Sequence, residues 1–354
     1  MVFPGKIAII TSPANFSEDD FRSAAGLIAK YGEDKIIHRT WPDNFLHEPE
    51  LMIATLAGLA ADSEIKALII NQADAGTNAA VDRLKESRGD IFIVYCTTHE
   101  PVSEAVTFAN LLITFNELGM GPAMVNQARK QGAKTFVHYS FPRHMTTVET
   151  LPRRLELIRE ECEKNGMLLL DITAADPEGE AGAEAARQFI LEDVPRVVSK
   201  YGEDTAFVCT SCPLQVPLIK AVIKSHAIYP QPCCPSPFHG FPEALGLENA
   251  GLDLNYLISE ACRIAEEKNM TDRLSTWSVS ASMMFTNAGA EYAIKWIKDE
   301  VPKTGIDDEV LLDCINNYIN EAVGEASNVY MHSYSENGIS YENFKLILMS
   351  YLDF

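Results

Sequence analysis

Lys6-Ile7-Ala8-Ile9-Ile10-Thr11-Ser12 is a β-branched, apolar run that ends in hydroxyl side chains and a polar turn. Similar runs recur along the chain and predict strands at residues 65–71, 91–96, 135–140, 206–210 and 276–280. Most of them are followed by a turn rich in polar residues and then by a stretch with helical periodicity. This alternation predicts an α/β protein with doubly wound sheets, in which ligands bind beyond the carboxyl ends of the strands.

The order of the predicted elements indicates two Rossmann-like lobes, each with a central parallel sheet, joined by a multi-strand hinge. We expect lobe one to contain residues 1–138 and 282–354, and lobe two residues 139–281. Ser17 stands before three acidic residues and is predicted to cap a helix that runs to Tyr31. Residues 307–354 are predicted to form one or two helices and a closing tail.

Composition excludes several classes of protein. The 354 residues carry a formal net charge of −21, which would repel nucleic-acid phosphates and anionic lipids, so we expect no nucleic-acid partner for this chain alone. The apolar runs are far shorter than the roughly 20 residues of a membrane span. Eight cysteines are too sparse for a disulfide scaffold.

The position of the first predicted strand gives an expectation about localisation. The first strand begins at Lys6, which leaves no room for a signal peptide. We therefore expect a cytoplasmic protein, or an exported lipoprotein if an upstream signal has been removed.

The strand ends of lobe one supply the first group of candidate ligand contacts, namely Ser12, Asn15, Phe16, Asn71, Asp74, Thr97 and His99. Turn formation and helix capping are the competing explanation for most of them. His99 and Glu100 could form an acid/base pair, but neighbours on an extended chain point to opposite faces.

The strand ends of lobe two supply the second group, namely Ser140, Phe141, Arg143, His144, Ser211, Cys212, Gln215, Phe238, His239 and Trp277. The planar guanidinium of Arg143 suits a carboxylate or phosphate, and a surface salt bridge is its alternative role. Residues 234–241 form a rigid, proline-rich aromatic loop that either covers a ligand or plugs a domain edge. Trp277 is either a stacking platform or part of the core.

Four cysteines of lobe two, at positions 209, 212, 233 and 234, resemble a thiolate zinc site in part. Cys209 and Cys212 have zinc-ligand spacing, but Cys233 and Cys234 are adjacent, and adjacent cysteines ligate one metal poorly. We therefore expect no metal. We also expect no cofactor, because dinucleotide and P-loop motifs are absent from the sequence, as are the zincin and hydrolase motifs.

The order of elements resembles the type I periplasmic-binding-protein fold, which sugar-binding proteins share with the effector domains of LacI-type repressors. The segments that carry the resemblance are residues 5–11, 65–72 and 134–140. Two further segments, residues 132–144 and 233–237, are similar to an uncharacterised bacterial family within this fold, whose members often resemble lipoprotein solute-binding components. The chain departs from LacI-type repressors, because five residues before the first strand cannot form a DNA-binding head of about 60 residues.

The resemblance implies a two-lobe protein that closes on a small polar ligand in the cleft between the lobes: a sugar, nucleoside, amino acid or small carboxylate. The first hypothesis is a solute-binding component that docks on a membrane permease. The second is a cytoplasmic sensor or regulator domain without its own DNA-binding head. The third, which we favour least, is an enzyme acting through His99, His144, His239 or Cys212. A homodimer is compatible with each.

Overall fold

The computed structural model describes residues 3–14, 18–43, 48–247, 253–324 and 327–354. It divides into two compact units. Unit 1 comprises residues 1–115 and 281–348, and unit 2 residues 116–280 and 349–354. The predicted α/β class with two parallel-sheet lobes is confirmed.

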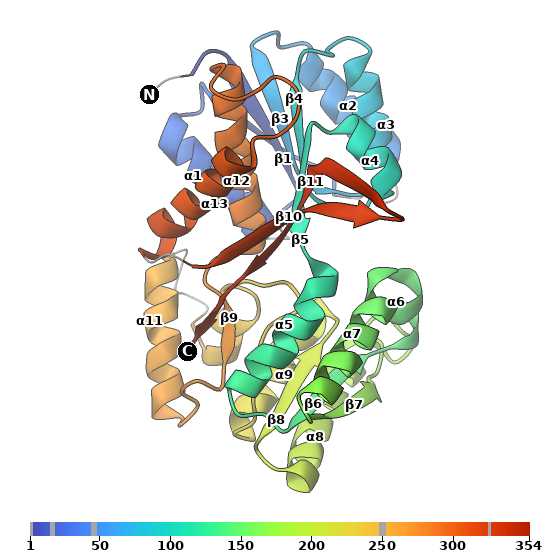
Figure 1. Ribbon diagram of the computed structural model, residues 1–354, viewed down its shortest axis with the longest axis vertical. Helices are drawn as coiled ribbons and strands as arrows, with labels where there is room; N and C mark the ends of the chain where they lie inside the picture. The colour runs from blue at the N-terminus through green and yellow to red at the C-terminus, as the bar shows by residue number, and fades with distance from the viewer. Residues whose placement is uncertain (1–2, 15–17, 44–47, 248–252, 325–326) are drawn as a thin grey trace. The chain divides into compact units, whose positions relative to one another are not determined.

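Unit 1 is built on one seven-stranded sheet with the strand order β10-β11-β5-β4-β3-β1-β2. Its elements are β1 (Lys6–Thr11), α1 (Glu18–Tyr31), β2 (Ile36–Thr40), α2 (Pro49–Ala60), β3 (Ile65–Ala73), α3 (Thr77–Lys85), β4 (Phe92–Thr98), α4 (Val102–Phe108), β5 (Leu111–Phe115), α12 (Ala281–Ile297), α13 (Asp308–Val323), β10 (Val329–Glu336) and β11 (Ile339–Met349). Strands β1 to β5 and β11 pair in parallel. Helices α1, α12 and α13 lie together on one face and α2, α3 and α4 on the other (Figure 1).

Unit 2 is built on a three-stranded parallel sheet with the order β7-β6-β8 and an antiparallel pair of β9 and β12. Its elements are α5 (Glu117–Lys130), β6 (Thr135–Ser140), α6 (Pro142–Thr147), α7 (Thr150–Lys164), β7 (Leu168–Thr173), α8 (Gly182–Tyr201), β8 (Thr205–Cys209), the 3₁₀ helix η1 (Cys212–Leu214), α9 (Gln215–Lys224), α10 (Phe241–Leu245), α11 (Leu254–Glu267), β9 (Ser275–Trp277) and β12 (Tyr351–Asp353).

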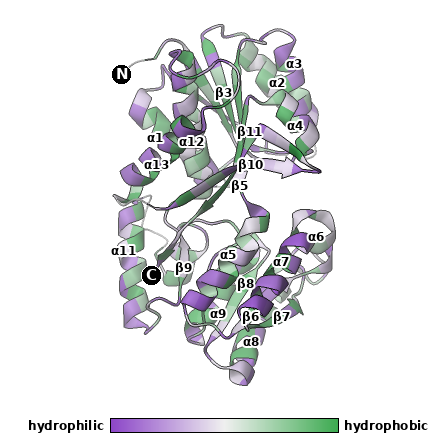
Figure 2. Cartoon of the chain, in the orientation of Figure 1, coloured by the Kyte–Doolittle hydropathy of each residue, from purple (hydrophilic) through white to green (hydrophobic). Residues whose placement is uncertain are grey.

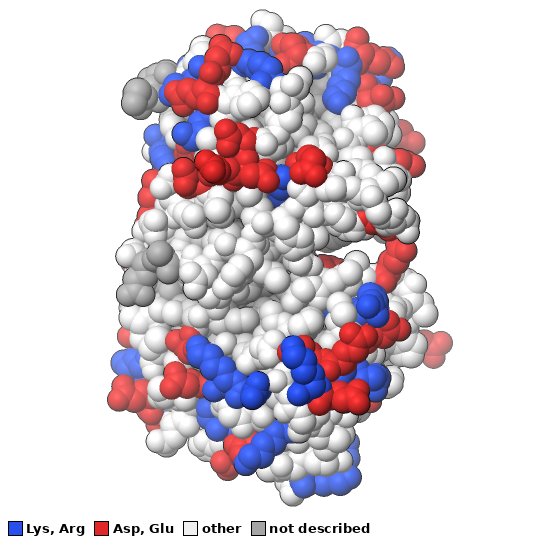
Figure 3. Space-filling model, in the orientation of Figure 1, with Lys and Arg blue, Asp and Glu red and all other residues white. Residues whose placement is uncertain are grey.

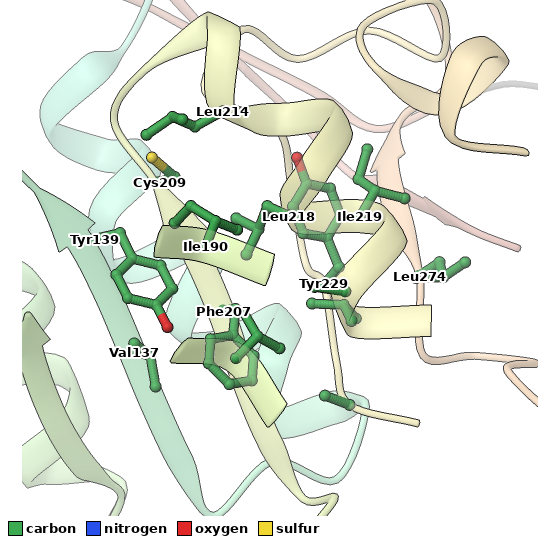
Figure 4. Close-up of a cluster of buried hydrophobic side chains, with 14 of the residues drawn as sticks. Val137, Tyr139, Ile190, Phe207, Cys209, Leu214, Leu218, Ile219, Tyr229 and Leu274 are labelled. Carbon is green, nitrogen blue, oxygen red and sulfur yellow. The ribbon is translucent and has the colours of Figure 1, made fainter. Parts of the chain in front are cut away.

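The core of unit 2 has two layers, because successive strand residues point to opposite faces of the sheet. Phe136 and Val208 pack beneath α5 and α7, whereas Phe207 and Cys209 pack against α8 and α9 (Figure 4). Figure 2 shows hydrophobic residues along the strands and hydrophilic residues along α7. Hydrophilic residues cover the exposed side of α7, as expected of a helix that buries one apolar stripe.

The unit boundaries differ from the expected lobe boundaries at residues 138/139 and near the C-terminus. Helix α5 packs on α7, and β6 pairs with β7 and β8, so residues 116–138 belong to unit 2. Residues 349–354 also belong to unit 2, where β12 pairs with β9. The chain therefore passes between the units at 115/116, 280/281 and 348/349.

The expectation of helices and a tail over residues 307–354 is wrong in its second half. Helix α13 is present, but β10 and β11 follow it as a hairpin joined by Asn337 and Gly338. Both linking residues have positive φ, 51° and 78°, as a two-residue hairpin turn of the primed type demands. The β11 strand then extends the parallel sheet beside β5.

Two helical glycines of unit 1 should respond oppositely to alanine. A Cβ at Gly289 of α12 would lie 2.9 Å from a methyl group of Val94 on β4, whereas a Cβ at Gly26 of α1 would meet no atom within 4 Å. Gly289→Ala should lower the free energy of unfolding by about 1–3 kcal/mol through overpacking. Gly26→Ala should raise it by up to about 1 kcal/mol through helix propensity. Urea unfolding followed by far-ultraviolet circular dichroism measures both, and equal effects would contradict the close approach of α12 to β4.

Candidate functional site

The carboxyl ends of β1, β3 and β4 bring several predicted site residues of unit 1 to one edge of its sheet. The three strands are parallel neighbours, with Ile10 opposite Ile70 and Ala73 opposite Thr98. The His99 backbone N–H donates to the Ala73 carbonyl oxygen over 2.9 Å. Ser12, Asp74 and His99, which directly follow these strands, are therefore gathered at the position that open α/β sheets use for ligands.

Asp74 and His99 form a hydrogen-bonded pair at this edge. Their Oδ1 and Nδ1 atoms lie 2.6 Å apart, and Asp74 is buried while the His99 side chain is exposed. Glu100 diverges from His99 and accepts the backbone N–H groups of Gly76 and Asn78 at the start of α3, over 3.0 and 2.7 Å. Burial raises the pKa of Glu100. The residue that pairs with His99 is thus Asp74 rather than its sequence neighbour.

Four buried polar atoms close to these strand ends have no hydrogen-bond partner among the described residues. They are Ser12 Oγ, Asp74 Oδ2, Thr77 Oγ1 and Asn78 Nδ2. Their residues lie in the turn after β1 and in the segment that joins β3 to α3. They offer two hydroxyl groups, one carboxylate acceptor and one amide donor. Sequence reasoning selected Ser12 and Asp74 but missed Thr77 and Asn78, which occupy the first turn of a helix just beyond a predicted site.

Other predicted contacts of unit 1 have different surroundings. The Asn71 side chain is buried and donates to the Ser282 and Thr286 hydroxyl oxygens of α12, over 2.9 and 2.6 Å. Thr97 is half-buried and has a positive φ of 55°, a strained conformation for a β-branched residue. Asn15, Phe16 and Ser17 lie outside the described residues.

In unit 2, the turn after β6 places Phe141 and His144 against each other. Their rings stack with centroids 5.1 Å apart, and Phe141 is buried. The His144 Nδ1 atom lies 3.0 Å from the Thr210 hydroxyl oxygen at the end of β8. Burial lowers the pKa of His144. Ser140 is also buried, and its carbonyl oxygen accepts the Ala174 N–H over 2.7 Å.

Arg143 binds carboxylates of its own chain. Its Nε and Nη2 atoms donate to Asp176 over 2.8 and 2.9 Å, and Nη2 lies 3.2 Å from Glu178. The guanidinium holds the pKa of Asp176 below its usual range. An acidic ligand at Arg143 would have to displace these side chains, so the predicted anchoring role stays a prediction.

Gln215 and Trp277 are buried within unit 2. The Gln215 amide donates to the carbonyl oxygens of Cys209 and Ser211, over 3.2 and 2.7 Å, and accepts from the Tyr229 hydroxyl group. This arrangement holds the turn between β8 and α9. Trp277 is fully buried in β9, where it pairs with Tyr351 of β12, and no described residue accepts a hydrogen bond from its Nε1 atom. Their roles as ligand contacts stay predictions.

Cys212 and His239 converge with two further cysteines of unit 2. Cys212 Sγ lies 3.3 Å from Cys233 Sγ and 3.6 Å from Cys234 Sγ, and His239 Nε2 lies 3.5 Å from Cys233 Sγ. Hydrogen bonds from Cys233 and Cys234 hold the pKa of Cys212 well below its usual range. Phe238, the other predicted contact of this loop, is half-buried, and its N–H donates to the Ser236 hydroxyl oxygen over 3.1 Å.

Cys209 does not join this group. Its side chain is buried with Ile190 and Leu214 in the core between β8 and α9 (Figure 4). Burial raises the pKa of its thiol to about 12. The two cysteines of the Cys-x2-Cys motif thus have different surroundings: Cys209 lies in the core, and Cys212 belongs to the cluster.

A surface hollow of unit 1 lies near the amino ends of β1 and β2, away from the strand ends described above. It has a volume of about 340 Å³ and is lined by Phe3, Lys30, Tyr31, Lys35, three residues of α12, Lys298 and Glu300. Glu291 occupies its polar side, with Oε1 accepting from Tyr31 over 2.6 Å and lying 3.0 Å from Lys30. Three of its polar side chains, those of Lys30, Tyr31 and Glu291, therefore satisfy one another.

The described helices include none that is long and apolar enough to cross a membrane. On the face drawn in Figure 3, basic side chains are interspersed with acidic ones, and no continuous basic stripe runs over the described residues. This pattern agrees with the net charge of −21.

The comparisons with known proteins agree with this architecture. Residues 5–275 match the family model "Protein of unknown function (DUF3798)". An uncharacterised protein of Treponema pallidum (strain Nichols) is 31% identical over 205 residues, which cover 58% of this chain and 93% of the relative. Among solved structures, a "Putative transcriptional regulator" from Clostridium difficile 630 is similar over the whole of both chains, with a TM-score of 0.86 and 20% identity.

An ABC transporter solute binding protein from Clostridium phytofermentas with bound L-rhamnose is similar over all of this chain and 96% of its own, with a TM-score of 0.52 and 9% identity. These structural likenesses concern the fold alone, because the sequence identities are low. The fold is the two-lobe fold of the periplasmic binding proteins, as the sequence resemblance implied. The chain belongs to the DUF3798 family.

Proposed function

We propose that this chain is a ligand-binding protein that takes a small polar molecule at the carboxyl ends of the unit 1 strands. The observation that carries the proposal is a set of four buried polar atoms, on Ser12, Asp74, Thr77 and Asn78, that no other described residue satisfies. Each such atom costs about 1–3 kcal/mol when nothing binds it, so their grouping calls for an explanation. A bound molecule that satisfies several of them at once supplies one.

The chemistry of these atoms favours a sugar. Asp74 Oδ2 accepts, Asn78 Nδ2 donates, and the Ser12 and Thr77 hydroxyl groups do either. A sugar hydroxyl group both donates and accepts, so sugar hydroxyl groups match each of these four atoms chemically. The bound L-rhamnose of the Clostridium phytofermentas protein supports the same class, because that protein shares the fold. Nucleosides, amino acids and small carboxylates are the competing ligands in the test below.

The finer form of the proposal is a solute-binding component of a transport system, whose ligand-bound form docks on a permease. The fold shared with solute-binding proteins supports it. The alternative is a ligand sensor or regulator domain, and its support is the name of the Clostridium difficile protein, "Putative transcriptional regulator".

Ligand identification tests the proposal directly. We would denature the purified protein gently, identify the released small molecules by mass spectrometry, and screen monosaccharides, nucleosides, amino acids and carboxylates by thermal shift. At a ligand concentration of 100 times Kd, binding to the native state should stabilise it by about 2.7 kcal/mol, which shifts Tm by several degrees. Stabilisation by a sugar supports the sugar class, whereas stabilisation by another class alone contradicts it. If no compound is retained or stabilises the protein, ligand binding itself is refuted.

Uptake measurements separate transport from sensing once the ligand is known. Deleting the gene should reduce uptake of the radiolabelled ligand by intact cells if the protein serves a permease. A sensor should leave the uptake rate of a constitutively expressed permease unchanged and should instead alter transcription when the ligand is added.

A further inference from the structure

We propose that four side chains of unit 2 bind one Zn²⁺ ion as a Cys₃His site: Cys212, Cys233, Cys234 and His239. The proposal goes beyond the ligand site of unit 1 and shares no residue with it. It also departs from the sequence-based expectation of no metal, which rested on the adjacency of Cys233 and Cys234.

The distances within the cluster match those of a tetrahedral thiolate site. A Zn–S bond of about 2.3 Å places two thiolates of a tetrahedron about 3.8 Å apart. The three Sγ–Sγ distances are 3.3, 3.6 and 3.9 Å, and the one from Cys233 Sγ to His239 Nε2 is 3.5 Å. All four candidate ligand atoms lie within 4.8 Å of one another. One ion can therefore contact all four with small adjustments.

Adjacency of Cys233 and Cys234 is compatible with this geometry because of where they lie. The segment between Tyr229 and α10 contains Pro230, Pro232, Pro235 and Pro237 and forms neither helix nor strand. The alternation that would send neighbouring side chains to opposite faces belongs to extended strands. In this irregular loop both thiols point to Cys212, their Sγ atoms lying 3.9 Å apart.

The kind of ligand decides which ion fits. Three thiolates and an imidazole are soft to borderline ligands, which favour Zn²⁺ over Mg²⁺ or Ca²⁺. A disulfide would use two of the three thiols and leave the third thiol and His239 without a role. The cysteines are free, and the three sulfur atoms are nearly equidistant. This symmetry favours an ion that all of them share.

A four-ligand site would be structural, since no position on the metal stays open for a substrate. It would join Cys212, at the start of η1, to the proline-rich loop that leads into α10. That loop has few hydrogen bonds of its own among the described residues, such as the one from His239 N–H to the Ser236 carbonyl oxygen over 3.2 Å. Cys212 and His239 would then be metal ligands rather than contacts of an organic ligand.

Cobalt substitution tests the site. We would reduce the full-length protein, remove metals with a chelator, confirm the free thiols with a thiol reagent, and titrate with Co²⁺ and then with Zn²⁺. We expect one Co²⁺ per chain, with thiolate-to-cobalt charge-transfer bands and the intense visible bands of tetrahedral Co²⁺, and their loss as Zn²⁺ displaces it. Zinc should also raise Tm.

Cys212→Ser should lose these bands, whereas Cys262→Ser, which removes a half-buried thiol of α11 outside the cluster, should keep them. His239→Gln provides a second variant if Cys212→Ser does not fold, and it should retain the charge-transfer bands with an affinity lowered at least tenfold. The proposal is overturned if the reduced wild-type protein binds no stoichiometric Co²⁺ or Zn²⁺, or if both cluster variants bind as the wild type does. It is also overturned if mass analysis of the isolated protein finds a stable disulfide that uses Cys212. None of these results bears on ligand binding in unit 1.

Discussion

Asp308→Ala should destabilise unit 1 by about 3 kcal/mol or more, because it leaves a buried ammonium group without its carboxylate. Lys345 of β11 has a side chain that is only 1% exposed, and its Nζ atom lies 2.7 Å from Asp308 Oδ1. The Ser333 hydroxyl oxygen of β10 lies 2.9 Å from Nζ, and the Glu342 carboxylate, which accepts from that hydroxyl group, interacts with Lys345 at longer range. Removing the Asp308 carboxylate therefore takes away the carboxylate that contacts the buried ammonium group directly. The midpoint of urea unfolding, followed by circular dichroism at pH 7, measures the loss.

Two further variants test whether the loss of stability comes from the unpaired Lys345 charge or from a weaker interaction with the helix dipole of α13. Glu309→Ala removes an exposed charge from the same first turn of α13 and should cost well under 1 kcal/mol, which controls for the helix dipole. Lys345→Met removes the buried charge itself and should cost much less than Asp308→Ala, because the half-exposed Asp308 can be hydrated. If Asp308→Ala and Glu309→Ala have the same small effect, Lys345 is not a buried charge in solution.

The regular elements were predictable because their signals are local. Helix α1 ends at Tyr31 and β6 occupies residues 135–140, as the sequence predicts, because apolar periodicity and the turns that bound it depend on adjacent residues. The unit boundary near residue 115 was not predictable in this way. It depends on α5 packing against α7, a contact between segments that the sequence does not place beside each other.

The hairpin of β10 and β11 was missed although a local signal existed. Asn337-Gly338 is the strongest two-residue hairpin signal, and Ile339 and Tyr341 follow it. The β10 strand, however, contains Tyr330, His332 and other residues with no continuous apolar run. A strand at the edge of a sheet buries little, so hydrophobicity alone does not reveal it.

The sequence predicts where the candidate site lies, but it does not predict which side chains there are available to a ligand. Strand ends identify Ser12 and Asp74, but the sequence cannot tell which polar groups their own chain satisfies. Asn71 donates to α12, far away in the sequence, and Gln215 holds the turn between β8 and α9. The cysteine cluster illustrates the same limit, since its four ligand atoms converge only through the path of an irregular loop.

Asp74→Asn should weaken binding of the ligand by a factor of ten or more without destabilising the free protein. Asp74 Oδ1 is occupied by His99, whereas Oδ2 is buried and has no partner in the part of the chain that the structure describes. A ligand hydroxyl group that donates to Oδ2 gains a charge-assisted hydrogen bond worth about 1.5–3 kcal/mol. Asparagine retains a carbonyl oxygen for His99 but presents an N–H donor where the hydroxyl group would donate. Isothermal titration with the ligand found by mass spectrometry measures the change in Kd.

The stability of the free variant is the sharper half of this prediction. An unpaired carboxylate oxygen in a buried position costs free energy, so replacing it with a neutral amide should leave Tm unchanged or raise it. Asp82→Asn, an exposed position on the neighbouring α3, provides the control and should change neither Kd nor Tm appreciably. A residue that serves binding at the cost of stability should lose affinity for the ligand when it is replaced, while the free protein keeps or gains stability. A residue whose role is purely structural would instead lose stability on substitution and bind the ligand as before, and that outcome would remove Asp74 from the site.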